Sequence, residues 1–346
     1  MRIVIVGDTN IQERDDPVSA FSKVRSLLER GDTLLGHAEG MFTEVARDRS
    51  LPSLPYKDRW RHSTPEMLGA FTEAGFDAVS MASNVSADPK AVADTVDAAG
   101  SLGLRICGIG ATLTEARKPA VVTKGDTTVA MLSRTSVFWP QLVPATDSRP
   151  GAATVRAYNA YQPGRRALEM PGAPPVVVTW PDEGELAALV EDIRKAKETA
   201  DCVILSMHWG VSSSPEVIDY QRTVAHAAID AGTALVFGHH PHVVCPLEVY
   251  RSVPIFYSLG NFAFDWEKAR NRILDGIVLD AEWDAEASAI RSVRITPVRR
   301  GDDNLIAELP DGAPEALKTR DFLLETAVGV PSSGLRSDGN SLILNI

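Results

Sequence analysis

Three histidines stand within four positions directly after a short apolar run, and this feature most constrains what the chain can fold into. Residues 234–237 read Ala-Leu-Val-Phe, which is typical of a buried strand, and a glycine ends the run. His239, His240 and His242 follow, with Pro241 between the last two. Imidazole is costly to bury unpaired but is a good metal ligand and proton carrier, and proline fixes φ. We therefore expect a functional site at the end of this strand, rather than a histidine-rich surface loop.

The chain before this motif alternates between strand-like and helix-like segments. Residues 2–6 form a β-branched apolar run, which suits a strand covered on both faces. Thr64 and Pro65 are residue types preferred at a helix start, and a turn at Lys124 to Asp126 predicts a hairpin over 121–133. Further strands are expected at 32–40, 77–81, 105–110, 202–207 and 234–237, and helices at 17–29, 65–74, 186–197 and 217–231, with another near Pro89. This alternation predicts an α/β fold.

Two regions depart from the alternation. Residues 136–180 are rich in Pro, Gly, Tyr and Arg, so they are either disordered or a functional loop, and the aromatic residues with Arg165 and Arg166 favour a substrate-facing insertion. Residues 301–346 contain one expected helix near 316–326 and no recognisable motif. We expect one domain over residues 1–300 that carries this insertion, with residues 301–346 as a C-terminal extension packed on it.

Composition excludes some classes of partner. The formal net charge of −11 argues against nucleic acid or an anionic membrane, since both require a basic face. No apolar run is long enough to span a bilayer, and the short N-terminal run reads as a strand rather than a signal peptide. Cys107, Cys202 and Cys245 form no disulfide pattern and suit a reducing compartment. The expected location is therefore the cytoplasm.

Five predicted strands end in a residue that can bind metal or move a proton. These residues are Asp8, Glu39, Asn84, His208 and the pair His240 and His242. Ligands of open α/β sheets bind beyond the carboxyl ends of the strands, so these side chains should converge. Carboxylate, amide oxygen and imidazole together suit a pair of Mn, Zn or Fe ions better than Mg or Ca, and two metals would generate a hydroxide nucleophile. The simpler alternative gives each residue a structural role, as a helix cap, a turn or a core histidine.

Six short motifs then resemble a known family in order and spacing. They are Gly7-Asp8, Ala38-Gly40, Ser83-Asn84, His208-Gly210, Gly238-Val244 and Tyr257-Asp265. Together they are similar to the poly-γ-glutamate synthesis (CapA-like) family of the calcineurin-like metallophosphatase superfamily, over about residues 1–300. The resemblance implies a four-layer αββα sandwich. It also implies metal ligands at Asp8, Glu39, Asn84, His208, His240 and His242.

The sequence departs from the metallophosphatase pattern at several points. Val85 stands where the family has the histidine that handles the leaving-group proton, and Asn10 replaces a histidine ligand of the first strand. His37 adds an imidazole two residues before Glu39, where the family usually has asparagine. The family's membrane anchor is not found, which argues against a cell-surface capsule role. These departures weaken the case for hydrolysis.

An α-carbon epimerase fits the departures best. Soluble relatives of this family invert a residue in a peptide, including lasso-peptide precursors, and the reaction needs two acid/base groups and no leaving-group acid. We expect Asp8, His208, His240 and His242 to be catalytic, with no cofactor required. A peptide substrate would contact Asn84, His37, Arg165 and Arg166. The alternatives are a dinuclear Mn, Zn or Fe hydrolase of phosphoester or peptide bonds and, less favoured, a non-catalytic binding protein.

Overall fold

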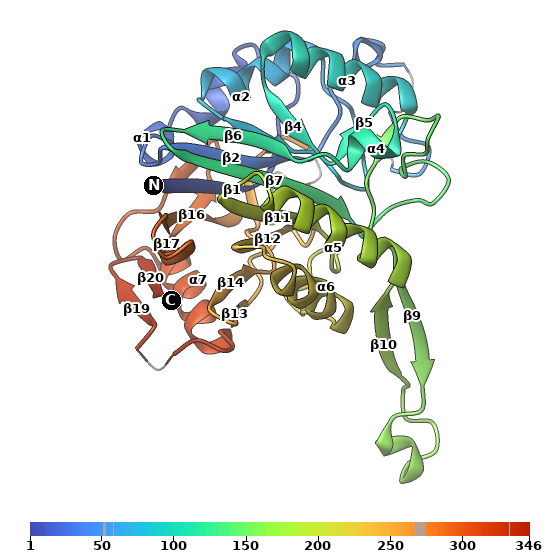
Figure 1. The fold of residues 1–346 in the computed structure, drawn as a ribbon, viewed down its shortest axis with the longest axis vertical. Coiled ribbons are helices and arrows are strands. Elements are labelled where there is room, and N and C mark those ends of the chain that lie inside the picture. The colour runs from blue at the N-terminus through green and yellow to red at the C-terminus, as the bar shows by residue number, and fades with distance from the viewer. Residues whose placement is uncertain (51–52, 58, 267–268, 270–273, 332) are drawn as a thin grey trace.

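The computed structural model describes residues 1–346 except 51–52, 58, 267–268, 270–273 and 332. Its frame is a pair of β-sheets, and the strands that open the chain lie at the centre of the larger one (Figure 1). In that sheet β1, β2, β3 and β4 run parallel, and β16, β17, β20 and β19 continue it antiparallel. The bounds are β1 (Arg2–Asn10), β2 (Thr33–Ala38), β3 (Ala78–Ser80), β4 (Arg105–Cys107), β16 (Asp275–Asp284), β17 (Ala289–Arg300), β19 (Leu335–Asp338) and β20 (Ser341–Asn345). Two short strands, β15 (Asn261–Phe264) and β18 (Ile306–Glu308), pair with β1 and β17.

The smaller sheet contains the strand that leads into the histidine motif. Its order is β13-β14-β12-β11-β7-β6, and β7, β11, β12 and β14 run parallel. The bounds are β6 (Ala120–Lys124), β7 (Thr127–Thr135), β11 (Cys202–His208), β12 (Leu235–His239), β13 (Leu247–Tyr250) and β14 (Val253–Phe256). The predicted hairpin over 121–133 is confirmed, because β6 and β7 pair across Lys124 and Thr127.

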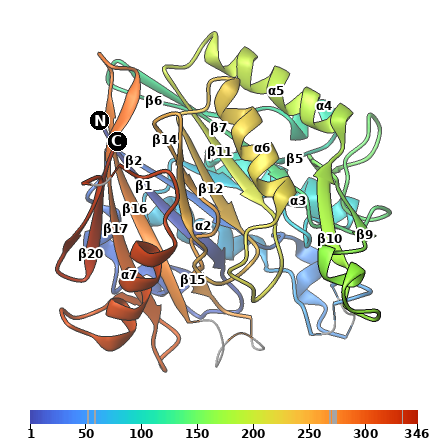
Figure 2. The ribbon, with the colours of Figure 1, turned by 90° about the horizontal axis from the view of Figure 1, so that it is seen from below.

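Helices cover the outer face of each sheet (Figures 1 and 2). On the larger sheet lie η1 (Pro17–Phe21), α1 (Arg25–Leu28), η3 (Pro65–Leu68), α2 (Gly69–Glu73) and α3 (Pro89–Leu102). The short turn η2 (Glu44–Arg47) has no buried residue and contacts α3. On the smaller sheet lie α5 (Glu183–Lys197) and α6 (Asp219–Asp230), the crossovers between parallel strands. The helices predicted at 17–29 and 65–74 each form as a 3₁₀ turn followed by a short α-helix. Among the described helices, none is both long and apolar enough to cross a membrane.

A third apolar layer lies between the two sheets. Ile3 and Ile5 of β1 pack there against Ile204 and Phe237 of the smaller sheet, while Val4 and Val6 point to the helices on the other side. Strand β1 is therefore buried on both faces, which is why its sequence is a continuous apolar run. Two helix layers enclosing two packed sheets confirm the predicted four-layer αββα sandwich.

The C-terminal residues form part of the larger sheet. Strand β20 pairs with β17, and Leu342 and Leu344 are buried in the layer between the sheets. Helix α7 (Pro314–Thr326) joins the same layer through Leu323. Within the described part of residues 301–346, β20 thus extends the larger sheet and α7 adds to the layer between the sheets.

Residues 136–180 contain regular structure. A short strand, β8 (Gly151–Ala152), pairs with β5 (Ile109–Gly110) beside α4 (Leu113–Ala116). Strands β9 (Ala157–Gln162) and β10 (Val176–Pro181) then form a hairpin that projects from the body, with η4 (Arg165–Leu168) at its tip (Figure 1). Most of the hairpin is solvent-exposed on both faces, so its strands lack the alternation of buried and exposed residues that a sequence pattern detects.

Candidate functional site

The carboxyl ends of the central strands bring the motif residues together at one edge of both sheets. Asp8 on β1 lies level with His37 on β2, and His208 on β11 lies level with His239 on β12. All four side chains have no exposed surface. The convergence expected from the strand-end pattern is therefore present, with residues of the two sheets facing one another.

Glycines allow the backbones around this edge to approach closely. A Cβ at Gly238, just before the histidines, would lie 2.0 Å from the backbone oxygen of Tyr257. A Cβ at Gly7, just before Asp8, would lie 2.3 Å from the backbone oxygen of Gly260. Glycine is thus required at both positions, because neighbouring backbone atoms occupy the space that a side chain would need.

The loop after β12 has an unusual backbone. His240 and His242 both have positive φ, 90° and 59°, on either side of Pro241. Such values cost about 1–3 kcal/mol for a residue with a side chain and occur where the surroundings enforce them. Here the backbone N–H of His240 donates a hydrogen bond to Asp8 Oδ2 at 3.2 Å, so the loop is tied to the first strand. We expected Pro241 to fix the geometry of this loop, and the residues on either side of it, His240 and His242, have a left-handed backbone conformation.

Two carboxylates and one imidazole form the tightest cluster. His242 Nδ1 lies 3.5 Å from Asp8 Oδ2, and His242 Nε2 lies 3.5 Å from Glu39 Oε2. Ligand atoms of these three residues lie within 4.8 Å of one another, which suits a metal ion. Asn261 Oδ1, from the Tyr257–Asp265 motif, lies 3.0 Å from His242 Nδ1 and orients the ring.

The other oxygen of Asp8 faces two further histidines. His37 Nε2 and His239 Nδ1 each lie 3.8 Å from Asp8 Oδ1, and their rings stack with centroids 4.2 Å apart. His37 Nδ1 is 3.0 Å from Ser80 Oγ, which fixes the ring. Sequence reasoning did not select His239 for the site, although it belongs to the motif. His239 could have been predicted from its position, because it is the last residue of a buried strand.

His208 and Asn84 complete the set, while Val85 points elsewhere. His208 Nδ1 lies 3.1 Å from Thr135 Oγ1, and its ring centroid is 4.7 Å from that of His240. Asn84 Oδ1 is buried without a hydrogen-bond partner in the described part of the chain. Val85 is fully buried in the core beneath the helices on the larger sheet. No proton-transferring group therefore stands at position 85.

Burial keeps the histidines of the site neutral. It lowers the pKa of His37 to about 4 and, together with neighbouring His242, the pKa of His240 to about 3. The pKa values of His208 and His239 also lie well below the usual range, first because of burial and then because other histidines are near. Neutral imidazoles can accept a proton or bind a metal.

The surroundings shift the pKa values of the two carboxylates in opposite directions. Burial, and then the neighbouring Glu39 carboxylate, raise the pKa of Asp8 well above its usual range. Burial would also raise the pKa of Glu39, but Lys57 and His242 outweigh it and lower that pKa. In the metal-free protein these surroundings favour the protonated form of Asp8 and the charged form of Glu39. Lys57, 3.4 Å from Glu39 Oε1, is a site residue that sequence reasoning missed, because no strand-end motif contains it.

Arg165 and Arg166 are not brought to this cluster. They lie in η4, at the tip of the projecting hairpin (Figure 1). Within the described residues, the only side-chain contact found for either is from Arg166 Nη2 to Met170 Sδ, at 3.6 Å.

Comparison with known proteins assigns the family. The model of the family described as "Bacterial capsule synthesis protein PGA_cap" matches residues 2–266. The chain belongs to this PGA_cap family. It is 28% identical over 269 residues to the PGA biosynthesis protein CapA of Bacillus subtilis (strain 168), covering 76% of this chain and 62% of that protein. It is 30% identical over 262 residues to the capsule biosynthesis protein CapA of Bacillus anthracis, covering 73% and 56%.

A shorter match reaches a third relative. The chain is 31% identical over 177 residues to a probable polyglutamine synthesis accessory protein, Rv0574c, of Mycobacterium tuberculosis (strain ATCC 25618 / H37Rv), covering 50% of this chain and 41% of that protein. This PGA_cap chain thus spans about three-fifths or less of the length of these relatives.

The residues present in this PGA_cap chain fit the divalent metal pair that the family suggests. Five of the six expected ligands have a buried polar atom without a hydrogen-bond partner in the described structure: Asp8 Oδ1, Glu39 Oε2, Asn84 Oδ1, His208 Nε2 and His240 Nδ1. A buried polar atom left unpaired costs free energy, so such a cluster is expected where a ligand completes it. His242 joins the set through its contacts with both carboxylates.

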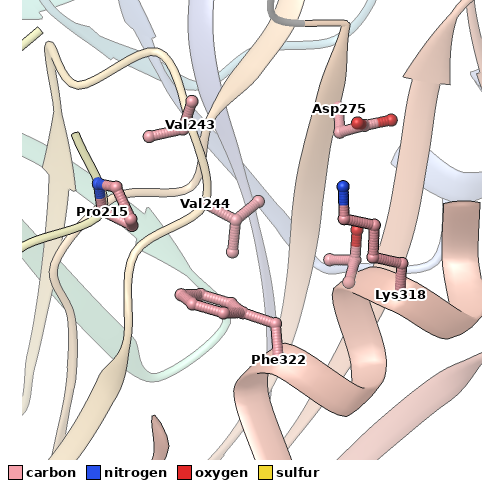
Figure 3. Close-up of a pocket in the computed structure, with 7 residues that line it drawn as sticks. Pro215, Val243, Val244, Asp275, Lys318 and Phe322 are labelled. Atoms are coloured by element: carbon pink, nitrogen blue, oxygen red, sulfur yellow. The ribbon is translucent and has the colours of Figure 1, made fainter. Parts of the chain in front are cut away.

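A cavity of about 270 Å³ borders the residues that follow His242 in this PGA_cap chain (Figure 3). Val243 and Val244, which follow His242, form one wall, and Lys318 and Phe322 of α7 form the opposite wall. The clustered carboxylates and histidines are not among its lining residues, so the cavity borders the loop without containing the candidate site.

Proposed function

We propose that this PGA_cap protein is a peptide epimerase that inverts an amino-acid α-carbon by acid/base proton transfer. The observation that carries the proposal is the buried cluster that places the Asp8 carboxyl group beside the imidazoles of His37, His239 and His242, with Val85 where hydrolysis would need an acid. Epimerisation breaks and remakes one C–H bond and has no leaving group. It therefore needs a base and an acid on opposite faces of the α-carbon, and this cluster contains both.

The proton transfers are assigned to Asp8 and one histidine of the group His208, His240 and His242. The neutral imidazole takes the α-proton, and the electron pair of the C–H bond moves onto the peptide carbonyl oxygen. Protonated Asp8 then donates its proton to the opposite face of the α-carbon, and the pair exchanges a proton to reset. The Asn84 side chain and the ring of His37 would contact the substrate carbonyl. No cofactor is needed for these steps.

The substrate is proposed to be a peptide whose flanking residues reach the hairpin β9–β10. Arg165 and Arg166 at its tip would bind a carboxylate of that peptide. The Arg165→Ala/Arg166→Ala double variant should raise KM several-fold and leave kcat unchanged, because neither residue is near the reacting atoms.

Deuterium exchange tests the proposal. A set of defined peptides is incubated with the full chain in D₂O, and the products are examined for one deuterium at each inverted α-carbon and for D-residues after hydrolysis. Asp8→Asn or His240→Ala should lower the exchange rate by about 10²-fold or more with folding intact. His226→Ala, which removes a histidine outside the cluster, is the matched control. Peptides that are cleaved, or phosphoesters that are hydrolysed, without α-deuterium would contradict the proposal.

A second candidate is a metal-dependent hydrolase of phosphoester or peptide bonds. The specific observation in its favour is the Asp8, Glu39 and His242 cluster. A pair of Mn, Zn or Fe ions held there, with Asn84, His208 and His240, would supply Lewis-acid polarisation of the scissile group. If the protein is such a hydrolase, we expect the purified protein to contain about two metal equivalents and to lose turnover when a chelator is added. We also expect the Val85→His variant to hydrolyse its substrate faster than the parent protein. Unchanged hydrolysis in Val85→His would count against this second candidate.

A further inference from the structure

Lys57 brings a positive charge to the outer side of the carboxylate pair. Its Nζ atom lies 3.4 Å from Glu39 Oε1, and its side chain is 16% exposed beside a fully buried Glu39. Neither the strand-end pattern nor the family ligand set includes this residue. Its ammonium nevertheless lies next to the Glu39 carboxylate, which would also bind a metal ion.

Aromatic rings hold the ammonium in this position. Lys57 Nζ lies 3.9 Å from the ring centroid of Trp60 and 4.8 Å from that of Trp266. Trp60 is fully buried, and the indole N–H of Trp266 donates to the backbone oxygen of Arg59 at 3.2 Å. Cation–π attraction to two rings restrains a side chain that is otherwise flexible. The structure therefore holds the Lys57 ammonium at a defined position beside Glu39.

The two oxygens of Glu39 face opposite ways. Oε1 faces Lys57, whereas Oε2 lies 3.5 Å from His242 Nε2, on the side of the Asp8, Glu39 and His242 cluster. A divalent ion at that cluster and the ammonium would flank one carboxylate. Two positive charges this close repel each other, and burial strengthens the repulsion because little water screens it.

We propose that the charge of Lys57, acting at Glu39, lowers the affinity of the site for divalent metal. Its ammonium balances the charge of Glu39 in the metal-free protein and opposes a second cation at the cluster. The inference goes beyond the proposed reaction, because it concerns the charge balance of the site and holds for an epimerase or a hydrolase. A merely structural Lys57 would instead hold Glu39 in place, and its loss would weaken metal binding.

Metal binding without substrate distinguishes these roles. The full chain is stripped of metal and titrated with Mn²⁺ or Zn²⁺ alone by isothermal calorimetry. Lys57→Met, which keeps the aliphatic stem against the tryptophans, should bind at least about tenfold more tightly than the parent protein, or about 1.4 kcal/mol. Lys57→Arg, which keeps the charge, should stay within about threefold of the parent. Glu39→Gln should weaken binding in either background.

Each result of the metal titration either supports the inference or contradicts it. Equal or weaker binding by Lys57→Met, or no detectable binding by either protein, would overturn the inference. If thermal unfolding shows that Lys57→Met is not folded, Lys57→Gln serves in the same titration with the same expectation. Because no substrate is present, a failure here leaves the epimerase proposal untouched, and absent deuterium exchange leaves the metal affinities unaffected.

Discussion

His62 shows what burial does to a single group in this protein. Its side chain is 4% exposed, and neither ring nitrogen has a hydrogen-bond partner in the part of the chain that the structure describes. Burial, and then the charge of Lys57, lower its pKa from 6.5 to about 4. The unfolded chain therefore binds a proton between these values that the folded chain does not. The free energy of unfolding must fall as the pH drops from 6.5 to 4.

Removing this imidazole should flatten the acid side of the stability profile. The His62 contribution lost across that window is on the order of 3 kcal/mol, at 1.36 kcal/mol per pKa unit. We expect the difference in unfolding free energy between pH 7 and pH 4 to be smaller by that amount in His62→Leu, measured by urea denaturation at each pH. A variant whose stability falls as steeply as the parent's would show that His62 is not neutral when buried.

Gly238 illustrates a residue whose absent side chain matters. A Cβ there would lie 2.0 Å from the Tyr257 backbone oxygen and 2.4 Å from the Trp209 indole nitrogen. Gly238→Ala should therefore cost more than about 3 kcal/mol of stability, as overpacking that only backbone movement can relieve. Gly100→Ala is the control, because a Cβ at this position in α3 meets no atom within 4 Å. That variant should gain roughly 0.5–1 kcal/mol, since alanine favours the helix.

At the scale of elements, the hairpin β9–β10 is attached at its base. Thr179 Oγ1 accepts a hydrogen bond from the backbone N–H of Tyr220 in α6 at 3.1 Å, and Asp182 caps α5. Its tip carries exposed side chains such as Tyr161 and Leu168, at 72% and 87% exposure. Folding therefore depends on the base of the hairpin and not on its tip.

Replacing residues 163–175 with a short Gly-Ser turn tests whether the tip of the hairpin contributes to the stability of the fold. Thermal unfolding should shift by no more than about 2 °C, because surface changes away from buried groups usually alter stability by less than 0.5 kcal/mol. Activity on a long peptide should fall through KM. A large loss of thermal stability would mean that the tip packs against the body.

At the scale of the whole molecule, the two sheets form one unit that includes the chain's last strand. Leu344 on β20 is fully buried between the sheets, although it is separated by hundreds of residues from the first strand. Leu344→Ala should cost about 2–5 kcal/mol of unfolding free energy, as expected for a buried leucine. Leu324→Ala in α7, at 39% exposure, should cost far less. Equal losses in urea denaturation would indicate that β20 is not part of the core.

The local sequence was enough to predict the strand ends and the fold class. Continuous apolar runs such as 2–6 and 234–237 occur in strands buried on both faces. Polar residues at or after the carboxyl ends of the strands led to the prediction of a site made of Asp8, Glu39, Asn84, His208, His240 and His242. These properties depend on side-chain type and spacing along the chain. They require no knowledge of what lies across the sheet.

Other features were decided only by tertiary structure, because they depend on which distant segments meet. His239 enters the site because β12 ends level with β11, facing His37 on the opposite sheet. Lys57 is held near Glu39 by the neighbouring Trp60 and by Trp266, which comes from a distant segment of the chain. The raised pKa of Asp8 likewise follows from complete burial beside another carboxylate. Burial and proximity arise from packing, and packing is a property of the folded chain as a whole.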